Sequence, residues 1–156
     1  MGQHLAQVNV GRLVAPIEHP SVQEFAKALV PINALADTSP GFVWRLQDDT
    51  GSATGIRIDD DECVIVNLSV WTDIESLTKF VYSTEHTAFL RRRREWFEPF
   101  GSVAVALWWV PDGHNPTVDE ALTRLDHLDR HGPTPTAFTF RTRFEPGESL
   151  ASSTFD

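Results

Sequence analysis

Cysteine is almost missing from this sequence: one residue in 156, which excludes an internal disulfide and a cysteine-rich metal site. Basic residues are also scarce, with 13 Lys and Arg against 22 Asp and Glu. The resulting formal charge of −9 argues against general nucleic-acid binding, which needs a basic surface. No apolar run approaches about 18 residues, so we predict that nothing spans a membrane. The first residues, MGQHLAQVNV, do not place an apolar segment after a basic one, and we expect a cytoplasmic protein.

Several chemical motifs are absent as well. There is no glycine-rich phosphate loop, no G-x-S-x-G, no paired cysteine and no H-E-x-x-H. Nucleotide-driven chemistry and triad hydrolysis are therefore not expected. The acidic run Asp59 to Glu62 lacks the ligand spacing of a calcium loop, and adjacent carboxylates point in different directions. We interpret it as a solvated turn and predict no metal site.

The chain has the length and composition of one globular domain, and its elements alternate. A hydroxyl residue followed three positions later by Glu marks three helix starts, at Ser21, Thr72 and Thr117. We expect helices that follow these residues, the second running from Asp73 to about Phe97. Apolar or alternating runs predict strands at residues 5–13, 42–47, 63–71 and 103–110, and a last strand or extended arm at 136–144.

This order predicts an α+β fold: a ferredoxin-like βαββαβ antiparallel sheet with an additional C-terminal helix and strand. We expect residues 1–144 to form the domain and residues 145–156 to form a flexible tail. Helices would cover one face of the sheet. The other face needs a cover, which is either the third helix or a second copy of the chain in a symmetric dimer.

The stretch from Val64 to Phe97 contains the best candidates for a site. Side chains alternate along a strand, so Asn67, Ser69 and Trp71 share one face. On a continuous helix, a stripe at i, i+4, i+7 and i+11 would combine Tyr82, His86, Phe89 and Arg93. These groups predict a small-molecule pocket between one strand and one helix.

Two polar or aromatic strand residues allow a structural and a functional interpretation. An unpaired buried amide costs about 1–3 kcal/mol, so Asn67 needs a partner, either a neighbouring protein group or a substrate or oxygen species. Gln7 and Asn9 share a face of the first strand and are weaker candidates of the same kind. Trp71 is either a core aromatic or a flat apolar wall against a planar substrate.

The helix supplies the titratable candidates. His86 has a reference pKa near 6.5, so it is either a structural hydrogen-bonding residue, an acid/base group or an iron ligand. Tyr82, the only tyrosine, is one turn away and either contacts the pocket or borders the core. The four arginines of the run from Arg91 point about 100° apart on a helix, so only Arg93 aligns with the stripe, where it pairs with an anionic substrate or with acidic residues.

Longer motifs in the sequence resemble a known family. The runs VNVGRL, PINALADTSPGFVWRLQD, NLSVW, FVYSTEHTAFLRRRREWF, LWWVPDGHNPTVDEAL and HGPTPTAFTFRTRF are similar to the bacterial family catalogued as domain of unknown function 3291. The βαββαβ order and the Asn67-x-x-x-Trp71 spacing resemble the wider superfamily, the antibiotic-biosynthesis-monooxygenase-like dimeric α+β barrels. The resemblance implies a homodimer with a pocket between helices and sheet, in which Asn67 and Trp71 line the site.

Members of that superfamily catalyse different reactions, so the fold does not select one. We expect most an enzyme of the cofactor-independent monooxygenase type, acting on an apolar aromatic or polyketide-like compound. Asn67, Tyr82 and His86 would be catalytic, and Trp71, Phe89 and Arg93 would bind substrate. An isomerase or cyclase stays open, as does a haem protein with His86 as axial ligand. A third alternative is a binding protein without catalysis.

Overall fold

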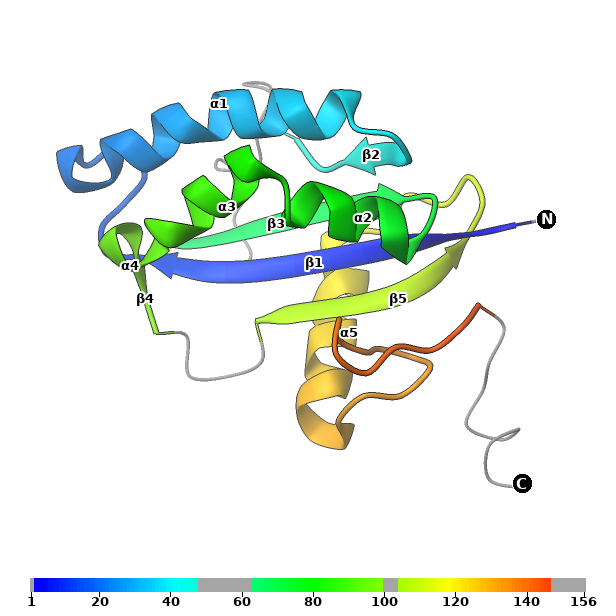
Figure 1. Cartoon of the computed structure of the whole chain (residues 1–156). Coiled ribbons are helices and arrows are strands. Elements are labelled where there is room, and N and C mark those ends of the chain that lie inside the picture. The colour runs from blue at the N-terminus through cyan, green and yellow to red at the C-terminus, as the bar shows by residue number, and fades with distance from the viewer. Residues whose placement is uncertain (1, 48–62, 100–103, 147–156) are drawn as a thin grey trace.

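The fold is an antiparallel sheet with helices on both of its faces, in a computed structural model that describes residues 2–47, 63–99 and 104–146 (Figure 1). The strands are β1 (Gln3–Leu13), β2 (Phe42–Arg45), β3 (Val64–Trp71), β4 (Phe97–Glu98) and β5 (Val105–Pro111). Central β1 pairs antiparallel with β3 on one side and with β5 and the short β4 on the other, and β2 pairs with β3. This strand order confirms the predicted α+β, ferredoxin-like sheet.

The helices agree with the prediction at both ends of the chain but differ in the middle. They are the 3-10 turn η1 (Pro20–Val22), α1 (Gln23–Thr38), α2 (Ile74–Val81), α3 (Thr84–Arg91), α4 (Arg93–Trp96) and α5 (Val118–His131). The prediction of one helix from Asp73 to Phe97 is therefore wrong, because the segment breaks after Val81 and again at Arg92. None of the helices in the described part of the chain is long and apolar enough to cross a membrane.

Local hydrogen bonds explain the first break. The side chain of Ser83 accepts a hydrogen bond from the backbone N–H of His86 (3.3 Å) and caps the start of α3. The imidazole of His86 lies 3.0 Å from the carbonyl oxygen of Val81 (Nδ1 to O), at the end of α2. A terminal carbonyl has no partner inside its own helix, so this contact replaces the missing one.

The helix starts are correct to within a few residues. The side chain of Thr117 accepts from the N–H of Glu120 (3.1 Å), as the predicted capping box requires. At α2 the cap is Asp73, which accepts from the N–H of Ser76 at 2.7 Å and takes the place of its neighbour Thr72. The capping role predicted for Ser21 is wrong, because this residue lies inside η1, whose cap is His19, although α1 begins only two residues later.

The third predicted helix, now α5, covers one face of the sheet. Even-numbered residues of β1 and β3 form this face with part of β5, and all of those in the apolar cluster here are 6% exposed or less. Ala121, Leu125 and Leu128 of α5 pack against them. A hydrogen bond from Trp108 Nε1 to the carboxylate of Glu120 (3.0 Å) ties the same helix to β5. The face is thus covered within one chain, and the homodimer stays a prediction.

Of the two alternatives for residues 136–144, a last strand or an extended arm, the strand is wrong. In its place the chain after α5 forms two isolated bridges, Leu107 with Phe138 and Thr134 with Ala137. Thr134 and Ala137 bond to each other across a tight turn, and among the described residues after α5 only Phe138 pairs with β5, through two hydrogen bonds to Leu107. Most of the predicted tail, 145–156, and the acidic run 59–62 lie outside the described residues.

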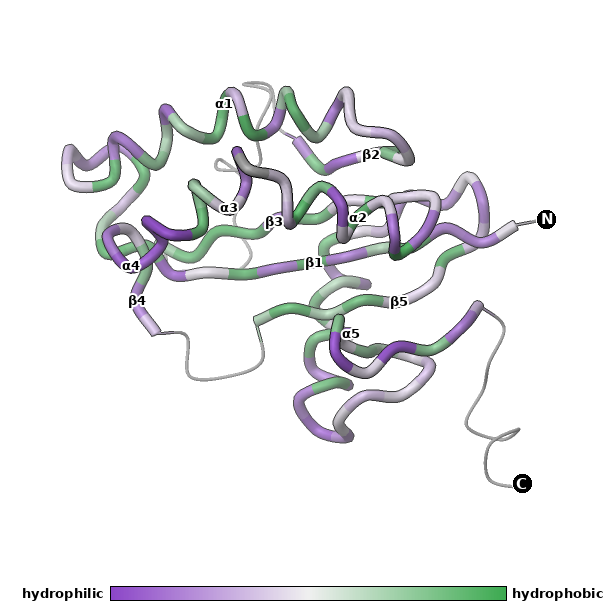
Figure 2. The backbone as a smooth tube through the Cα atoms, viewed as in Figure 1, coloured by the Kyte–Doolittle hydropathy of each residue, from purple (hydrophilic) through white to green (hydrophobic). Residues whose placement is uncertain are grey.

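The opposite face of the sheet, toward α1–α4, is apolar at its ends and polar in the middle. One cluster contains Leu5 and Trp71, and a second contains Leu13, Phe25 and Trp96. The odd-numbered residues of β1 between these clusters are Gln7, Asn9 and Gly11. Figure 2 shows the alternation of hydropathy along β1 that results from this pattern. The polar gap between the two apolar clusters is therefore the candidate location of the functional site.

Candidate functional site

A hydrogen-bonded row of side chains fills the polar gap on the sheet face toward α1–α4. Strand register sets Asn9 opposite Asn67, Gln7 opposite Ser69 and Leu5 opposite Trp71. Gln7 Nε2 donates to Asn67 Oδ1 at 2.6 Å and to Ser69 Oγ at 2.8 Å. Asn9 Nδ2 lies 3.2 Å from Gln7 Oε1 and 3.3 Å from Asn67 Oδ1, and Trp71 Nε1 donates to Ser69 Oγ at 2.9 Å. These bonds connect five side chains into one unit, called here the amide row: Gln7, Asn9, Asn67, Ser69 and Trp71.

The amide row leaves specific groups available for a ligand. Because Oδ1 of Asn67 accepts hydrogen bonds from Gln7 and Asn9, its Nδ2 points away from them, and it donates to no described residue. Gln7 and Ser69 are each only 6% exposed, whereas Asn67 and Asn9 are exposed. The buried members fix the orientation of the exposed ones. The row thus presents two amide N–H donors of Asn67 at an open surface.

A second row of side chains, called here the aromatic row, consists of Phe80, His86, Phe89 and Trp96 on α2–α4 and contacts the amide row at Trp71. The stacked pair Trp71–Phe80 has ring centroids 5.2 Å apart, Phe80–His86 4.8 Å and His86–Phe89 6.2 Å. Phe89 continues to Trp96 at 5.4 Å. Trp71 itself is 1% exposed, so it is a core residue that reaches the site through its indole N–H, and direct contact with a substrate is not favoured. Phe89 is only half-buried and is the better candidate for an apolar wall.

His86 is a half-buried base inside this aromatic row. Since a carbonyl oxygen only accepts, Nδ1 must carry the proton that it donates to Val81, and Nε2 keeps the lone pair. Burial lowers the pKa of His86, and the hydrogen bond to the Val81 carbonyl opposes that effect. The imidazole is therefore neutral at pH 7. A neutral Nε2 could accept a proton from a substrate, while Nδ1 has a structural role.

The breaks in the helix separate the residues that the predicted stripe combined. Tyr82 is 70% exposed at the end of α2, and its hydroxyl has no hydrogen-bond partner among the described residues, His86 included. Arg93 is exposed at the start of α4. The arginine with defined partners is Arg92, which bonds to Glu24 and Glu95 and lies 4.8 Å above the ring of Trp96. Hydrogen bonds to Glu95 and Glu24 raise the pKa of Arg92.

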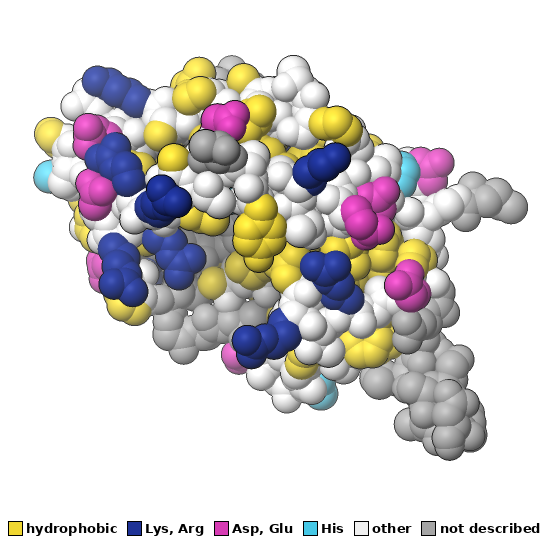
Figure 3. Space-filling model, viewed as in Figure 1, with side chains coloured by type: hydrophobic (Ala, Val, Ile, Leu, Met, Phe, Trp, Pro, Cys, Tyr) yellow, Lys and Arg dark blue, Asp and Glu magenta, His cyan; other side chains and the backbone are white. Residues whose placement is uncertain are grey.

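A surface hollow lies next to the exposed end of the amide row. Asn9, Asn67 and Val105 stand side by side on β1, β3 and β5, and all three are exposed, Val105 to 37%. Figure 3 shows a hollow in the molecular surface below the region where α3 and α4 lie in Figure 1. The exposed amides of Asn9 and Asn67 lie on the sheet face toward these helices, on the same side of the molecule as the hollow.

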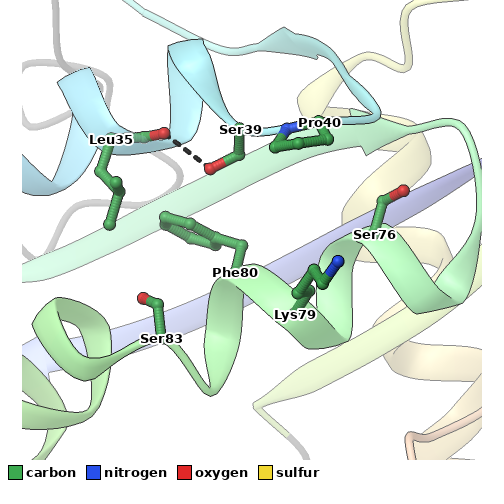
Figure 4. A pocket seen from close by; sticks show the side chains of 7 residues that line it. All are labelled: Leu35, Ser39, Pro40, Ser76, Lys79, Phe80 and Ser83. Carbon is green, nitrogen blue, oxygen red and sulfur yellow. Dashed lines mark hydrogen bonds between the residues drawn. The ribbon is translucent and has the colours of Figure 1, made fainter.

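A separate small cavity lies between the end of α1 and α2. Its volume is about 190 Å³, and seven residues line it: Leu35, Ser39, Pro40, Ser76, Lys79, Phe80 and Ser83 (Figure 4). Typical ligand sites have about 300–1,000 Å³. Phe80 is the one lining residue that also belongs to the aromatic row, and no member of the amide row is among them. This cavity is too small for the predicted substrate, and we place the candidate site at the hollow.

The described residues do not fit a metal or a haem group. They contain no group of three or more His, Cys, Asp or Glu that could hold a metal ion. His86, the predicted axial ligand, stands between Phe80 and Phe89 in the aromatic row. It does not line the 190 Å³ cavity, which would itself be too small for a porphyrin. The haem alternative has no support in this geometry.

Two members of the site were missed at the level of sequence. Ser69 shares its strand face with Asn67, but its role as a double acceptor depends on Gln7, 62 positions away. Phe80 was outside the predicted stripe, because the stripe assumed one continuous helix. The alternation of Gln7 and Asn9 with valines on β1 was the signal in the sequence for the role of Ser69. The pair Ser83–His86 was the signal for the helix break that brings Phe80 into the site.

The fold and the amide row together define a ferredoxin-like α+β protein with a polar site on the helix side of its sheet. The sequence matches the family described as domain of unknown function (DUF3291) over residues 4–154, so the chain belongs to that family. The family prediction is thereby confirmed. A search of the curated proteins found no match.

Solved structures are similar in fold at low identity. Protein SO0527 from Shewanella oneidensis has a TM-score of 0.53 at 12% identity, covering 70% of this chain and 93% of that protein. SnoaB, a cofactor-independent oxygenase from Streptomyces nogalater, has a TM-score of 0.46 at 16% identity, over 75% and 98% of the two chains. A proposed antibiotic biosynthesis monooxygenase from Nitrosomonas europaea has a TM-score of 0.46 at 12% identity, over 70% and 88%. At these identities the likeness concerns the fold alone.

Proposed function

We propose that this protein binds a planar, apolar aromatic or polyketide-like compound in the hollow and oxygenates it without a cofactor. One observation carries the proposal: the Asn67 amide is held through its oxygen by Gln7 and Asn9, so that its N–H groups face an open surface. Fixed donors of this kind stabilise negative charge that develops on a substrate oxygen. The half-buried ring of Phe89, on the same side of the sheet, would offer an apolar wall to the substrate.

The proposed chemistry needs no external reductant. A CH₂ group conjugated with a carbonyl loses a proton to a base, and the resulting enolate gives electrons to O₂. The carbon–oxygen bond forms, and the CH₂ group becomes C=O while the second oxygen atom leaves as water. Asn67 would donate hydrogen bonds to the enolate oxygen, and Nε2 of His86 would take the proton. Tyr82 and Arg93 would contact the substrate at the border of the site.

Oxygen uptake with a hydroxyanthrone tests the proposal, because its CH₂ group lies between two rings and forms a carbanion readily. We expect one O₂ consumed per quinone formed, measured with an oxygen electrode and by absorbance. Loss of a fixed oxyanion donor typically lowers kcat by about 10²–10³-fold, so Asn67→Ala should have an effect of this size. Asn115→Ala, an exposed amide before α5, is the matched control. Oxygen uptake no faster than in buffer would contradict the proposed activity.

Binding without catalysis is the second candidate. It is favoured because neither Tyr82 nor His86 hydrogen-bonds to the amide row, and the Nδ1 proton of His86 is already used by Val81. Under this alternative, the hydroxyanthrone binds to the protein and is recovered unchanged. Three results would favour binding over the oxygenase: fluorescence shows that the hydroxyanthrone binds, His86→Ala binds it with unchanged affinity, and no oxygen uptake is measured.

A further inference from the structure

Positive charge is concentrated beside the hollow in a protein that is otherwise acidic. The chain has a net charge of −9, yet four arginines follow one another from Arg91 to Arg94 across the end of α3 and the start of α4. Figure 3 shows Lys and Arg side chains gathered around the hollow, on the side where α3 and α4 lie in Figure 1. The cations are therefore placed at the border of the candidate site.

In the described part of the chain, Arg92 is the one arginine of the four that pairs with acidic residues. Arg92 bonds to Glu24 on α1 and to Glu95 on α4, and so connects the two helices. Arg91, Arg93 and Arg94 are exposed and have no ion-pair partner in the part of the chain that the structure describes. The acidic residues of the described part of the chain therefore leave these three guanidinium groups without an ion pair.

We propose that the ligand of the hollow is an anionic aromatic compound, whose acidic group is held by Arg91, Arg93 and Arg94. Guanidinium groups bind carboxylates and similar anions with charge-assisted hydrogen bonds. The N–H donors of Asn67 add to the same preference, since they also favour an electron-rich oxygen. This inference rests on the proposed function, which places a ligand in the hollow, and adds that ligand's charge.

Two fluorescent probes with the same aromatic body separate charge from shape. The anionic probe is 8-anilinonaphthalene-1-sulfonate, and N-phenyl-1-naphthylamine is the neutral counterpart without the sulfonate. With the full chain at low salt, we expect the anionic probe to bind about tenfold more tightly, a preference that salt reduces by screening. Arg93→Glu and Arg94→Glu should each weaken the anionic probe about tenfold and leave the neutral probe unchanged.

Arg130→Glu is the matched control. Arg130 lies on α5, on the other side of the sheet, is 70% exposed and pairs with Asp126, so its reversal changes the net charge equally and away from the hollow. Equal loss of anionic-probe binding in Arg130→Glu and Arg93→Glu would overturn the inference, as would equal affinity of the two probes. Absence of binding by the neutral probe, or its insensitivity to Asn67→Ala, would instead overturn the proposed site.

Discussion

Gln7→Met is the most direct test of the amide row, because it removes the central side chain and keeps its length. Gln7 is 6% exposed and takes part in three side-chain hydrogen bonds, of 2.6, 2.8 and 3.2 Å. Each such bond contributes about 0.5–1.5 kcal/mol net. Water can replace the bonds to exposed Asn9 and Asn67, but it reaches Ser69 poorly. The added apolar burial of Met opposes part of the loss, so we expect about 1–2 kcal/mol of lost stability.

Urea unfolding followed by tryptophan fluorescence measures the change, and Gln3→Met is the control. Gln3 lies on the same strand and the same face of β1, but it is exposed and has no side-chain hydrogen bond to a described residue. Surface changes of this kind stay within about 0.5 kcal/mol. If Gln7→Met unfolds at the same urea concentration as Gln3→Met, the amide row does not hold the site together.

A double-mutant cycle separates the Gln7–Asn67 bond from the rest. Groups in direct contact couple by about 0.5–3 kcal/mol, and the 2.6 Å contact places this pair in that range. Gln7→Met, Asn67→Ala and the double variant should therefore give a coupling energy of about 1 kcal/mol. Gln7→Met should also weaken binding of the neutral naphthylamine probe, because Asn67 loses its fixed orientation, and Asn67→Ala should weaken it because the amide is removed. A coupling energy near zero with unchanged probe affinity would refute the reasoning.

The remaining predictions concern His86, a turn and the oligomeric state. Burial lowers the folded-state pKa of His86 below the unfolded value of about 6.5. The neutral imidazole therefore stabilises the fold fully above about pH 6.5, and this contribution is lost as the pH falls toward the folded pKa. NMR titration should give a pKa below 6.5, and His86→Gln should remove this part of the pH dependence of the free energy of unfolding. Gly41→Ala should lower the free energy of unfolding by more than about 2 kcal/mol, because φ is +84° and an added Cβ would press on Ser76. Gly113→Ala has a similar φ of +90° but an added Cβ would meet open space, so thermal unfolding should show a loss of about 1 kcal/mol. Sedimentation equilibrium should give twice the 17.5 kDa of one chain if the homodimer forms, and a single-chain mass would contradict it.

Much of the fold was predictable because local patterns specify it. Alternating valines and leucines placed β1, β3 and β5 correctly, and the pair Thr117–Glu120 fixed the start of α5. The errors arose where a side chain competes with the regular pattern. Ser83 and His86 together end one helix and begin the next, and after α5 the chain turns at Thr134–Ala137, where these two residues bond to each other. Periodicity alone does not detect such single contacts.

The sequence by itself determined the family, the ferredoxin-like order and the presence of Asn67 and His86 on elements beside each other. Tertiary structure decided which of their atoms are available. Strand register brought Gln7 to Asn67 and Ser69 from 60 and 62 positions away, and this contact fixes the amide oxygen inward. Packing of α5 decided which sheet face is closed. Both outcomes depend on contacts between residues distant in the chain, and no local pattern in the sequence encodes those distances.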